Sequence, residues 1–362
     1  MKLAEREWKW VEEASAKELV ALASKQLRLD ITAVDATPEN VSALEFGNLL
    51  HVELTEIFEE VFPPGTSLAE ELADQVQLCR AFSDPAQVLD VVTKRVAAAA
   101  SRFPRNAADL KVGDNKGDVL DPFILAANFE LLSSCSLGRT VETSLSHKVL
   151  MKVEDLVGNM HETLLGAMRG NFKIPEPRRG LGGTKEVIQP YSNPFPGADI
   201  GQVPAPENPS AIRLFQVKNK TGSAKGGDGA RLGRQLKLLE QTYGAKTFFV
   251  AIVGNTLRGH RSKGAVLRES PNTAVLVGEA ALSELGRSKS GAELLLRTYR
   301  RAFRVAAAQA GYDFDAVAFT VQAEFHSEAE AAGTDFVDAW LQEAMGGPRS
   351  EQDSRYQDPG NA

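Results

Sequence analysis

The residues best suited to chemistry are Asp199, in the segment PFPGADIG, and the pair Gln216 and Lys218, in the segment LFQVKNK. Side chains at positions i and i+2 of an extended strand share a face, so Gln216 and Lys218 are expected to point the same way. If the short strand that begins at Asp199 is a neighbour of the strand that carries Gln216, the three side chains meet in one cluster.

Such a cluster suits hydrolysis of a phosphodiester. The Asp199 carboxylate is a ligand for Mg²⁺, which prefers oxygen atoms and keeps several waters. The Gln216 amide oxygen is a second, neutral ligand or orients a metal-bound water, and Lys218 positions that water or neutralises the transition state. Two structural interpretations stand beside this one: an Asp after Pro-Gly is often only a turn residue, and Lys218 is also typical of a strand edge protected from aggregation.

The elements that must position these residues follow the order helix, strand, strand, strand, helix, strand between residues 140 and 254. Apolar spacing and turn signals predict helices over 140–168 and 229–243, and strands over 185–191, 198–203, 211–220 and 246–254. This order predicts an α/β fold with a mixed sheet flanked by helices.

The order of elements, with Asp199 after Pro-Gly and Gln-x-Lys on the following strand, resembles the PD-(D/E)XK nuclease superfamily, which includes many type II restriction endonucleases. The resemblance covers residues 140–254. It implies a restriction-endonuclease-like fold, Mg²⁺ as cofactor and double-stranded DNA as substrate. Gln216 stands where the family usually has an acid, as in the Gln-x-Lys version found in some branches, and the exchange removes one negative charge from the metal site.

Members of this family often supply a further carboxylate from the first helix. The resemblance places Glu154 there as a catalytic and metal-binding residue, with Asp199 and Gln216 as the other metal ligands. Glu162, eight residues further on, falls close to the same face and is the second choice, and Glu142 is the third. A solvated helix acid is the other interpretation of each.

Positive charge is concentrated after the Gln216 strand, although the chain has a net charge of −7. Residues 211–270 hold 12 Lys and Arg against 3 Asp and Glu, whereas residues 1–60 hold 6 against 13. The asymmetry predicts an anionic partner, and a solvated basic surface is the alternative. Glycines in the segment 222–229 would let backbone N–H groups approach an anion. The expected DNA-binding residues are Lys220, Lys225, Arg231, Arg234, Arg258, Arg261, Lys263, Arg178 and Arg179.

The rest of the chain is predicted to be mainly helical. Residues 1–135 form a helical region for dimerisation or DNA embrace, 136–345 the nuclease core with C-terminal elaborations, and 346–362 a disordered tail. Within the first region, Ser67 is expected to cap a helix with Glu70 three residues on. The segment AVAFTVQAEF, 316–325, alternates as a strand does, and 334–345 is expected to be a helix.

Composition excludes several classes of protein. The two cysteines form neither a disulfide framework nor a structural zinc site, the N-terminal segment lacks the apolar core of a secretory signal, and no run is long enough for a membrane span. A cytoplasmic location without membrane contact is therefore expected.

These observations predict a Mg²⁺-dependent, sequence-specific type II restriction endonuclease that acts as a homodimer, because symmetric cutting of both strands needs two active sites. Two alternatives remain: a non-catalytic DNA-binding protein with a decayed nuclease core, which Gln216 favours, and a repair or recombination nuclease that reads DNA structure.

Overall fold

The computed structural model describes residues 9–30, 48–112, 120–175, 195–204, 208–220, 228–253 and 261–345. Contacts divide the chain into two compact units, each built from two segments. Met1–Lys94 and Val157–Ala306 form the first, here called the sheet unit, and Arg95–Leu156 and Ala307–Ala362 form the second, the helical unit. The predicted division into a helical region, 1–135, and a nuclease core, 136–345, was based on function and stays a prediction. The predicted disordered tail, 346–362, lies outside the described residues.

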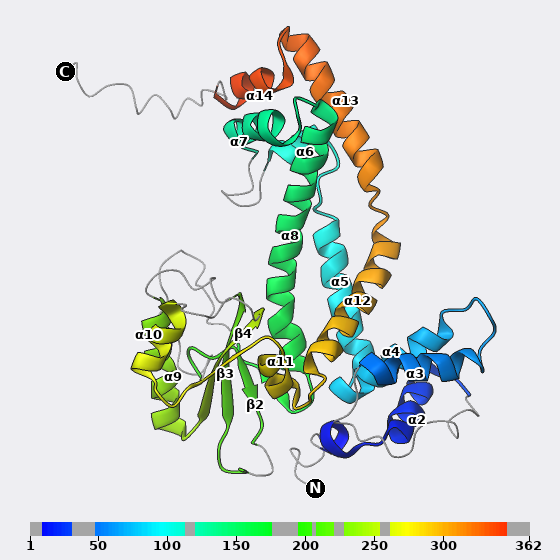
Figure 1. Cartoon of the computed structure of the whole chain (residues 1–362), viewed down its shortest axis with the longest axis vertical. Coiled ribbons are helices and arrows are strands. Elements are labelled where there is room, and N and C mark those ends of the chain that lie inside the picture. The colour runs from blue at the N-terminus through cyan, green and yellow to red at the C-terminus, as the bar shows by residue number, and fades with distance from the viewer. Residues whose placement is uncertain are drawn as a thin grey trace. The chain divides into compact units, whose positions relative to one another are not determined.

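The sheet unit contains a five-stranded mixed sheet in the order β1-β2-β3-β4-β5 (Figure 1). β2 pairs antiparallel with both β1 and β3, whereas β4 and β5 run parallel to β3. The predicted α/β fold with a mixed sheet is therefore confirmed. The strands span Asn171–Lys173, Ile200–Gln202, Arg213–Lys220, Lys246–Val253 and Ala274–Val277.

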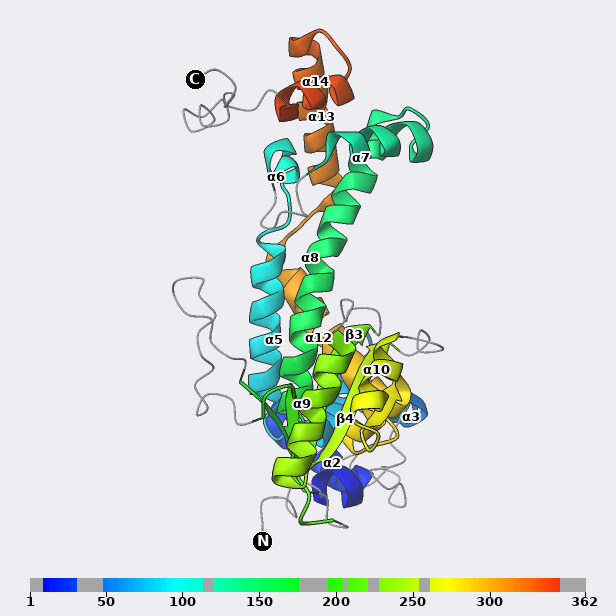
Figure 2. The ribbon, with the colours of Figure 1, turned by 90° about the vertical axis from the view of Figure 1, so that its left-hand side faces the viewer.

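Helices cover both faces of this sheet. α9 (Asp228–Tyr243) and α10 (Arg261–Glu269) lie side by side (Figures 1 and 2), and the leucines of α9 pack with Leu214 and Phe249 in one apolar core. On the other face Phe215 stacks on Phe248 with ring centroids 4.4 Å apart. α11 (Glu279–Gly286) contacts β4 and β5. Both faces of β3 are therefore buried, which explains its near-continuous apolar sequence.

The predicted order of elements is found, but its first strand is elsewhere. α8 (Leu137–Ala167) is followed by β1 at Asn171–Lys173, where no strand was predicted, while the strand predicted at 185–191 lies outside the described residues. β1 is held by the Asn171 side chain, whose Nδ2 donates to the carbonyls of Leu165 and Leu285. A three-residue strand is too short to show an alternating pattern.

Cap geometry at the start of a helix is clear for α2 (Ala16–Leu27) and α4 (Leu68–Ala81) of the sheet unit. α2 opens with a capping box between Ser15 and Glu18. Ser67 is the N-cap residue of α4, as predicted, but its side chain makes no capping hydrogen bond, because its backbone is not extended and its hydroxyl bonds Glu71 instead. The other elements are η1 (Lys9–Glu13), α3 (Asn48–Glu59), the first part of α5 (Pro85–Ala100) and most of α12 (Gly291–Ala310).

The helical unit packs around one apolar core that includes Leu145, Val321, Phe325 and Phe336. The strand predicted at 316–325 is wrong, since these residues lie in a helix. Ala318, Val321, Phe325 and Ala329 are buried at helical spacing, and tertiary packing selects this period over the alternating one in the same letters. The elements wholly within the unit are α6 (Ala107–Lys111), α7 (Pro122–Ala127), η4 (Asn128–Leu132), α13 (Phe314–Ala332) and α14 (Phe336–Met345).

None of the helices within the described ranges combines the length and the apolar composition needed to cross a membrane.

Candidate functional site

Asp199 lies directly before β2 and is held by the main chain on both sides. Its N–H donates to the carbonyl of Phe215 at 2.8 Å, and its own carbonyl accepts from the N–H of Ile174 at 2.9 Å. Gly197, two residues earlier, has a φ of +95°, which glycine adopts without strain. A Cβ there would lie 2.6 Å from the Cβ of Gln235 in α9, so the bend packs directly on that helix.

The structure brings the carboxylate of Asp199 together with the side chain of Gln216. Asp199 Oδ2 accepts a hydrogen bond from Gln216 Nε2 and another, at 2.7 Å, from the backbone N–H of Val217. β2 begins only at Ile200, so the carboxylate supplies the acceptor that a longer strand would offer to Val217. Gln216 is 3% exposed, which makes this contact part of the folded sheet.

Lys218 lies on the same face of β3 as Gln216, two residues further on. Leu214, on this face, is packed against α9, so Gln216 and Lys218 also point to the α9 side of the sheet. Lys218 is half-buried, and within the described part of the chain it has no ion-pair partner. We call Asp199, Gln216 and Lys218 the sheet cluster. Their part in catalysis stays a prediction.

The three candidate helix acids fall in different units. Glu162 belongs to the sheet unit, where its Oε2 lies 3.2 Å from the Nζ of Lys173 in β1. Glu154, the first choice, and Glu142 are exposed residues on the part of α8 that belongs to the helical unit. The structure therefore places only Glu162 in the same unit as Asp199, and the role of Glu154 stays a prediction.

Some of the predicted DNA-binding residues are exposed on α9 and α10. Arg231 donates from Nη1 to Gln235 Oε1 at 3.2 Å, Arg234 forms an ion pair with Glu269 at 3.3 Å, and Lys263 is exposed on α10. Those outside the described residues are Lys225, Arg258, Arg178 and Arg179, together with the side chains of Lys220 and Arg261.

Gly229 has a packing role that sequence reasoning did not predict. The glycine was expected to expose backbone N–H groups to an anion, but a Cβ there would lie 3.0 Å from the Cα of Ser262 in α10. At Gly233, one turn later, a Cβ would lie 2.9 Å from the carbonyl oxygen of Val266. Both glycines therefore allow α9 and α10 to approach closely. The other glycines of the predicted anion loop lie outside the described residues.

Gln235 is a neighbour of the cluster that sequence reasoning missed. Its side chain lies against Gly197, two residues from Asp199, and accepts a hydrogen bond from Arg231. The only available signal was its position on α9, four residues after Arg231, which places both on one face of the helix. This contact links the basic surface of α9 to the bend that positions Asp199.

The sheet cluster has a small set of possible metal ligands. The described residues contain no group of three or more His, Cys, Asp or Glu side chains that could hold a metal ion. Mg²⁺ does not require one, because it is often bound by one or two carboxylates together with waters and substrate phosphates. Asp199 and Gln216 fit that smaller set if the amide rotates, since its nitrogen now faces the carboxylate.

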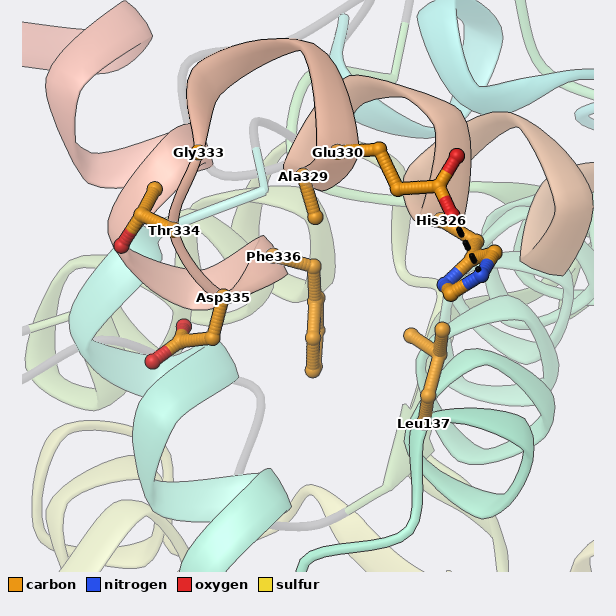
Figure 3. Close-up of a pocket in the computed structure, with 8 residues that line it drawn as sticks. All are labelled: Leu137, His326, Ala329, Glu330, Gly333, Thr334, Asp335 and Phe336. Carbon is orange, nitrogen blue, oxygen red and sulfur yellow. Dashed lines mark ion pairs between the residues drawn. The ribbon is translucent and has the colours of Figure 1, made fainter.

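A separate pocket in the helical unit, of about 410 Å³, is less suited to DNA (Figure 3). His326 forms an ion pair with Glu330 at 3.2 Å on its rim, and Asp335 is a second lining acid. None of the described lining residues is a Lys or Arg, so these residues offer no fixed cation to a phosphate. The sheet cluster therefore remains the candidate site.

Comparisons with known proteins add no relative: no protein-family model matches this sequence, and the search of curated proteins finds no significant match.

Proposed function

We propose that this chain is a Mg²⁺-dependent endonuclease of double-stranded DNA with a restriction-endonuclease-like core. The observation that carries the proposal is the hydrogen-bonded contact between Asp199 and Gln216 at the junction of β2 and β3, with Lys218 on the same face as Gln216. The order α8, β1, β2, β3, α9, β4 supports it, because this is the order that the PD-(D/E)XK resemblance implies.

In this proposal the side chains of the cluster divide the work of hydrolysis. Asp199 and the amide oxygen of Gln216 would hold the cation, which would lower the pKa of a bound water and offset charge on the phosphate. Lys218 orients that water or neutralises the additional charge of the transition state. The water oxygen forms a bond to phosphorus and releases one proton to solvent, one bridging P–O bond breaks, and the leaving oxygen takes up a proton from solvent.

The surface beside the cluster supports DNA as the substrate. Arg231, Arg234 and Lys263 are exposed on the adjacent helices α9 and α10, and Arg231 is linked through Gln235 to the bend before Asp199. Contacts from such residues to phosphates would give an affinity that falls steeply with salt. A type II restriction enzyme would use two copies of this site to cut both strands.

The test is cleavage of supercoiled plasmid with Mg²⁺ or with EDTA, for the wild-type chain and for Lys218→Ala. We expect cleavage only with Mg²⁺ and its loss in Lys218→Ala. Lys237→Ala, at an exposed lysine of α9, is the matched control and should cut as the wild type does. Equal cleavage by Lys218→Ala and the wild type would show that the site is assigned wrongly.

A second candidate, a DNA-binding protein with a decayed nuclease core, is favoured by the amide at position 216 and its nitrogen facing Asp199. It predicts salt-dependent DNA binding with no cleavage in either Mg²⁺ or Mn²⁺. If the chain does cut, discrete fragments from a long duplex support restriction, whereas preference for branched substrates supports a repair or recombination nuclease.

A further inference from the structure

Four exposed apolar side chains of the helical unit lie on one short helical segment, α7, which Figure 1 labels, with η4 directly after it. Phe123 and Ile124 are each 66% exposed, Leu131 is 81% exposed and Leu132 is 72% exposed. Apolar patches larger than a few hundred Å² are rare on monomeric proteins, and the largest patch on a protein is often functional. We call these four residues, with the exposed Ala127 between them, the apolar stripe.

A π-turn aligns the two ends of the stripe. In a regular α-helix, residues eight apart differ by about 80° around the axis. η4 is wider, with a bond from the N–H of Ser133 to the carbonyl of Asn128 at 2.9 Å, and this reduces the angle between Phe123 and Leu131. Such turns inside helices occur frequently at functional sites.

The segment is held firmly from its inner side. Asn128 Nδ2 donates to the carbonyl of Thr140 and to Ser144 Oγ on α8, and Phe129 packs edge-on against Phe336 with centroids 5.0 Å apart. Leu125 is buried in the same core. The outer side chains are therefore exposed on a well-anchored helix, so their exposure does not result from loose packing.

The charged residues near the apolar stripe limit the classes of partner that it can bind. Between residues 120 and 138 the only charged side chains are Asp121 and Glu130, and no Lys or Arg occurs. DNA and anionic membrane surfaces are bound through Lys and Arg, so neither suits this stripe. Its apolar side chains fit an apolar surface on another protein molecule.

The pattern of the stripe is self-complementary. Phe123, Ala127 and Leu131 follow one another at intervals of four residues as large, small and large side chains. Two copies that cross antiparallel at Ala127 would place Phe123 of each against Leu131 of the other, which is the geometry of a two-fold interface. The four large residues would bury roughly 500 Å² per copy, or about 1,000 Å² in total, which is near the lower limit for a specific interface.

We propose that the apolar stripe is the homodimer interface of this protein. The inference rests on the proposed function, because cutting both DNA strands calls for two copies. It assigns dimerisation to the helical unit, apart from the sheet cluster.

The primary test is the oligomeric state of the full chain by sedimentation velocity. We expect a dimer for the wild type and, for Leu131→Glu, a dissociation constant raised about 100-fold, because the new charges would be buried in the interface. Phe319→Glu is the matched control, since Phe319 is a 75% exposed apolar residue on α13 of the same unit. It should dimerise as the wild type does, and both variants should keep the wild-type circular dichroism spectrum.

Cys135 offers an independent measurement beside the stripe. Cys135 is exposed and Cys79 is buried, so a spin label attaches selectively to Cys135. A dimer through the stripe gives a defined label-to-label distance that Leu131→Glu abolishes. The inference is overturned if the wild type stays monomeric at about 100 µM, if Leu131→Glu dimerises like the wild type, or if the stripe is shielded without dimerisation.

These outcomes are separable from failure of the proposed function. Asp199→Asn should abolish cleavage and leave the dimer unchanged, whereas Leu131→Glu should lose paired double-strand cuts while single-strand nicking persists. A dimer that binds through the stripe but never cuts DNA would retain the inference and reject the nuclease.

Discussion

Two polar clusters, one in each unit, differ in the groups that contact their charged side chains. In the helical unit Lys111 is only 7% exposed, and its Nζ donates to Glu328 at 2.8 Å and to Glu343 at 2.6 Å. The same atom lies 4.6 Å from the ring centroid of Trp340. In the sheet cluster, Asp199 accepts hydrogen bonds from the neutral groups of Gln216 and Val217, and Lys218 remains half-buried.

The difference separates a stabilising cluster from one suited to binding. Burial alone would lower the pKa of Lys111, but its hydrogen bonds to Glu328 and Glu343 and their charges outweigh burial and raise the pKa above the ordinary value. A charge that is matched by fixed partners has little capacity to bind a ligand. The donors from Gln216 and Val217 to Asp199 are uncharged, so these two hydrogen bonds do not neutralise a carboxylate that could bind a cation.

The largest expected effect tests the binding role of the sheet cluster. Asp199→Asn keeps an oxygen that accepts from the N–H of Val217 but removes the charge, so cleavage should fall by about 1,000-fold or more while the fold is retained. Initial rates on plasmid in Mg²⁺ measure this. Asp315→Asn, at an exposed acid of α13, is the control, and unchanged cleavage by Asp199→Asn would remove the cluster from the mechanism.

The next effect tests the stabilising role of Lys111. Lys111→Met keeps the length of the side chain but leaves two glutamates without their cation, and should lower the free energy of unfolding by about 2 kcal/mol. Denaturant unfolding measures the loss. Lys94→Met breaks an exposed pair with Asp90 and should cost about 0.5 kcal/mol or less. Similar losses in both variants would show that the burial of Lys111 is unimportant.

A third substitution changes the sheet cluster toward the usual acidic form of the motif. Gln216→Glu places a second carboxylate against Asp199, and like charges in contact should lower stability by about 1–2 kcal/mol without metal. A cation that binds between the two acids should restore it. Thermal melting in EDTA and in Mg²⁺ measures both effects, and equal melting temperatures in the two conditions would argue against a metal site.

The pH dependence of unfolding tests the contribution of Lys111 to stability. Because the folded-state pKa of Lys111 is raised, its contribution to stability is complete below the unfolded pKa of about 10.4 and is lost as the pH rises through the folded value. The free energy of unfolding should therefore decline more steeply above pH 10.4 in the wild type than in Lys111→Met. Parallel curves would contradict the assignment.

The smallest effect concerns one thiol in each unit. Burial raises the pKa of Cys79 in the sheet unit to about 12, while Cys135 in the helical unit is exposed and its pKa is raised by its hydrogen bond to Glu130. A thiol reagent at pH 8 should modify only Cys135 in the folded chain, and Glu130→Gln should quicken that reaction a few-fold. Rapid reaction of both thiols would show that Cys79 is accessible.

The parts of the fold that were predicted correctly have strong local patterns. β4 is a continuous apolar run, and α9 repeats Leu232, Leu236 and Leu239 at helical spacing, so burial and period agree. β1 was missed because it is too short to show a period. The helix α13 was missed because its residues fit two periods, and only packing against the helical unit decides between them.

The sequence by itself determined which chemical groups the protein has and roughly which elements carry them: an acid after Pro-Gly, an amide and a lysine two apart on a buried strand, and a basic helix after that strand. Tertiary structure decided that Asp199 faces the nitrogen of Gln216, that Gly229 packs on α10, and that the apolar stripe is exposed. These features depend on pairing and packing between segments that are distant in the chain, so the local sequence around each residue does not predict them.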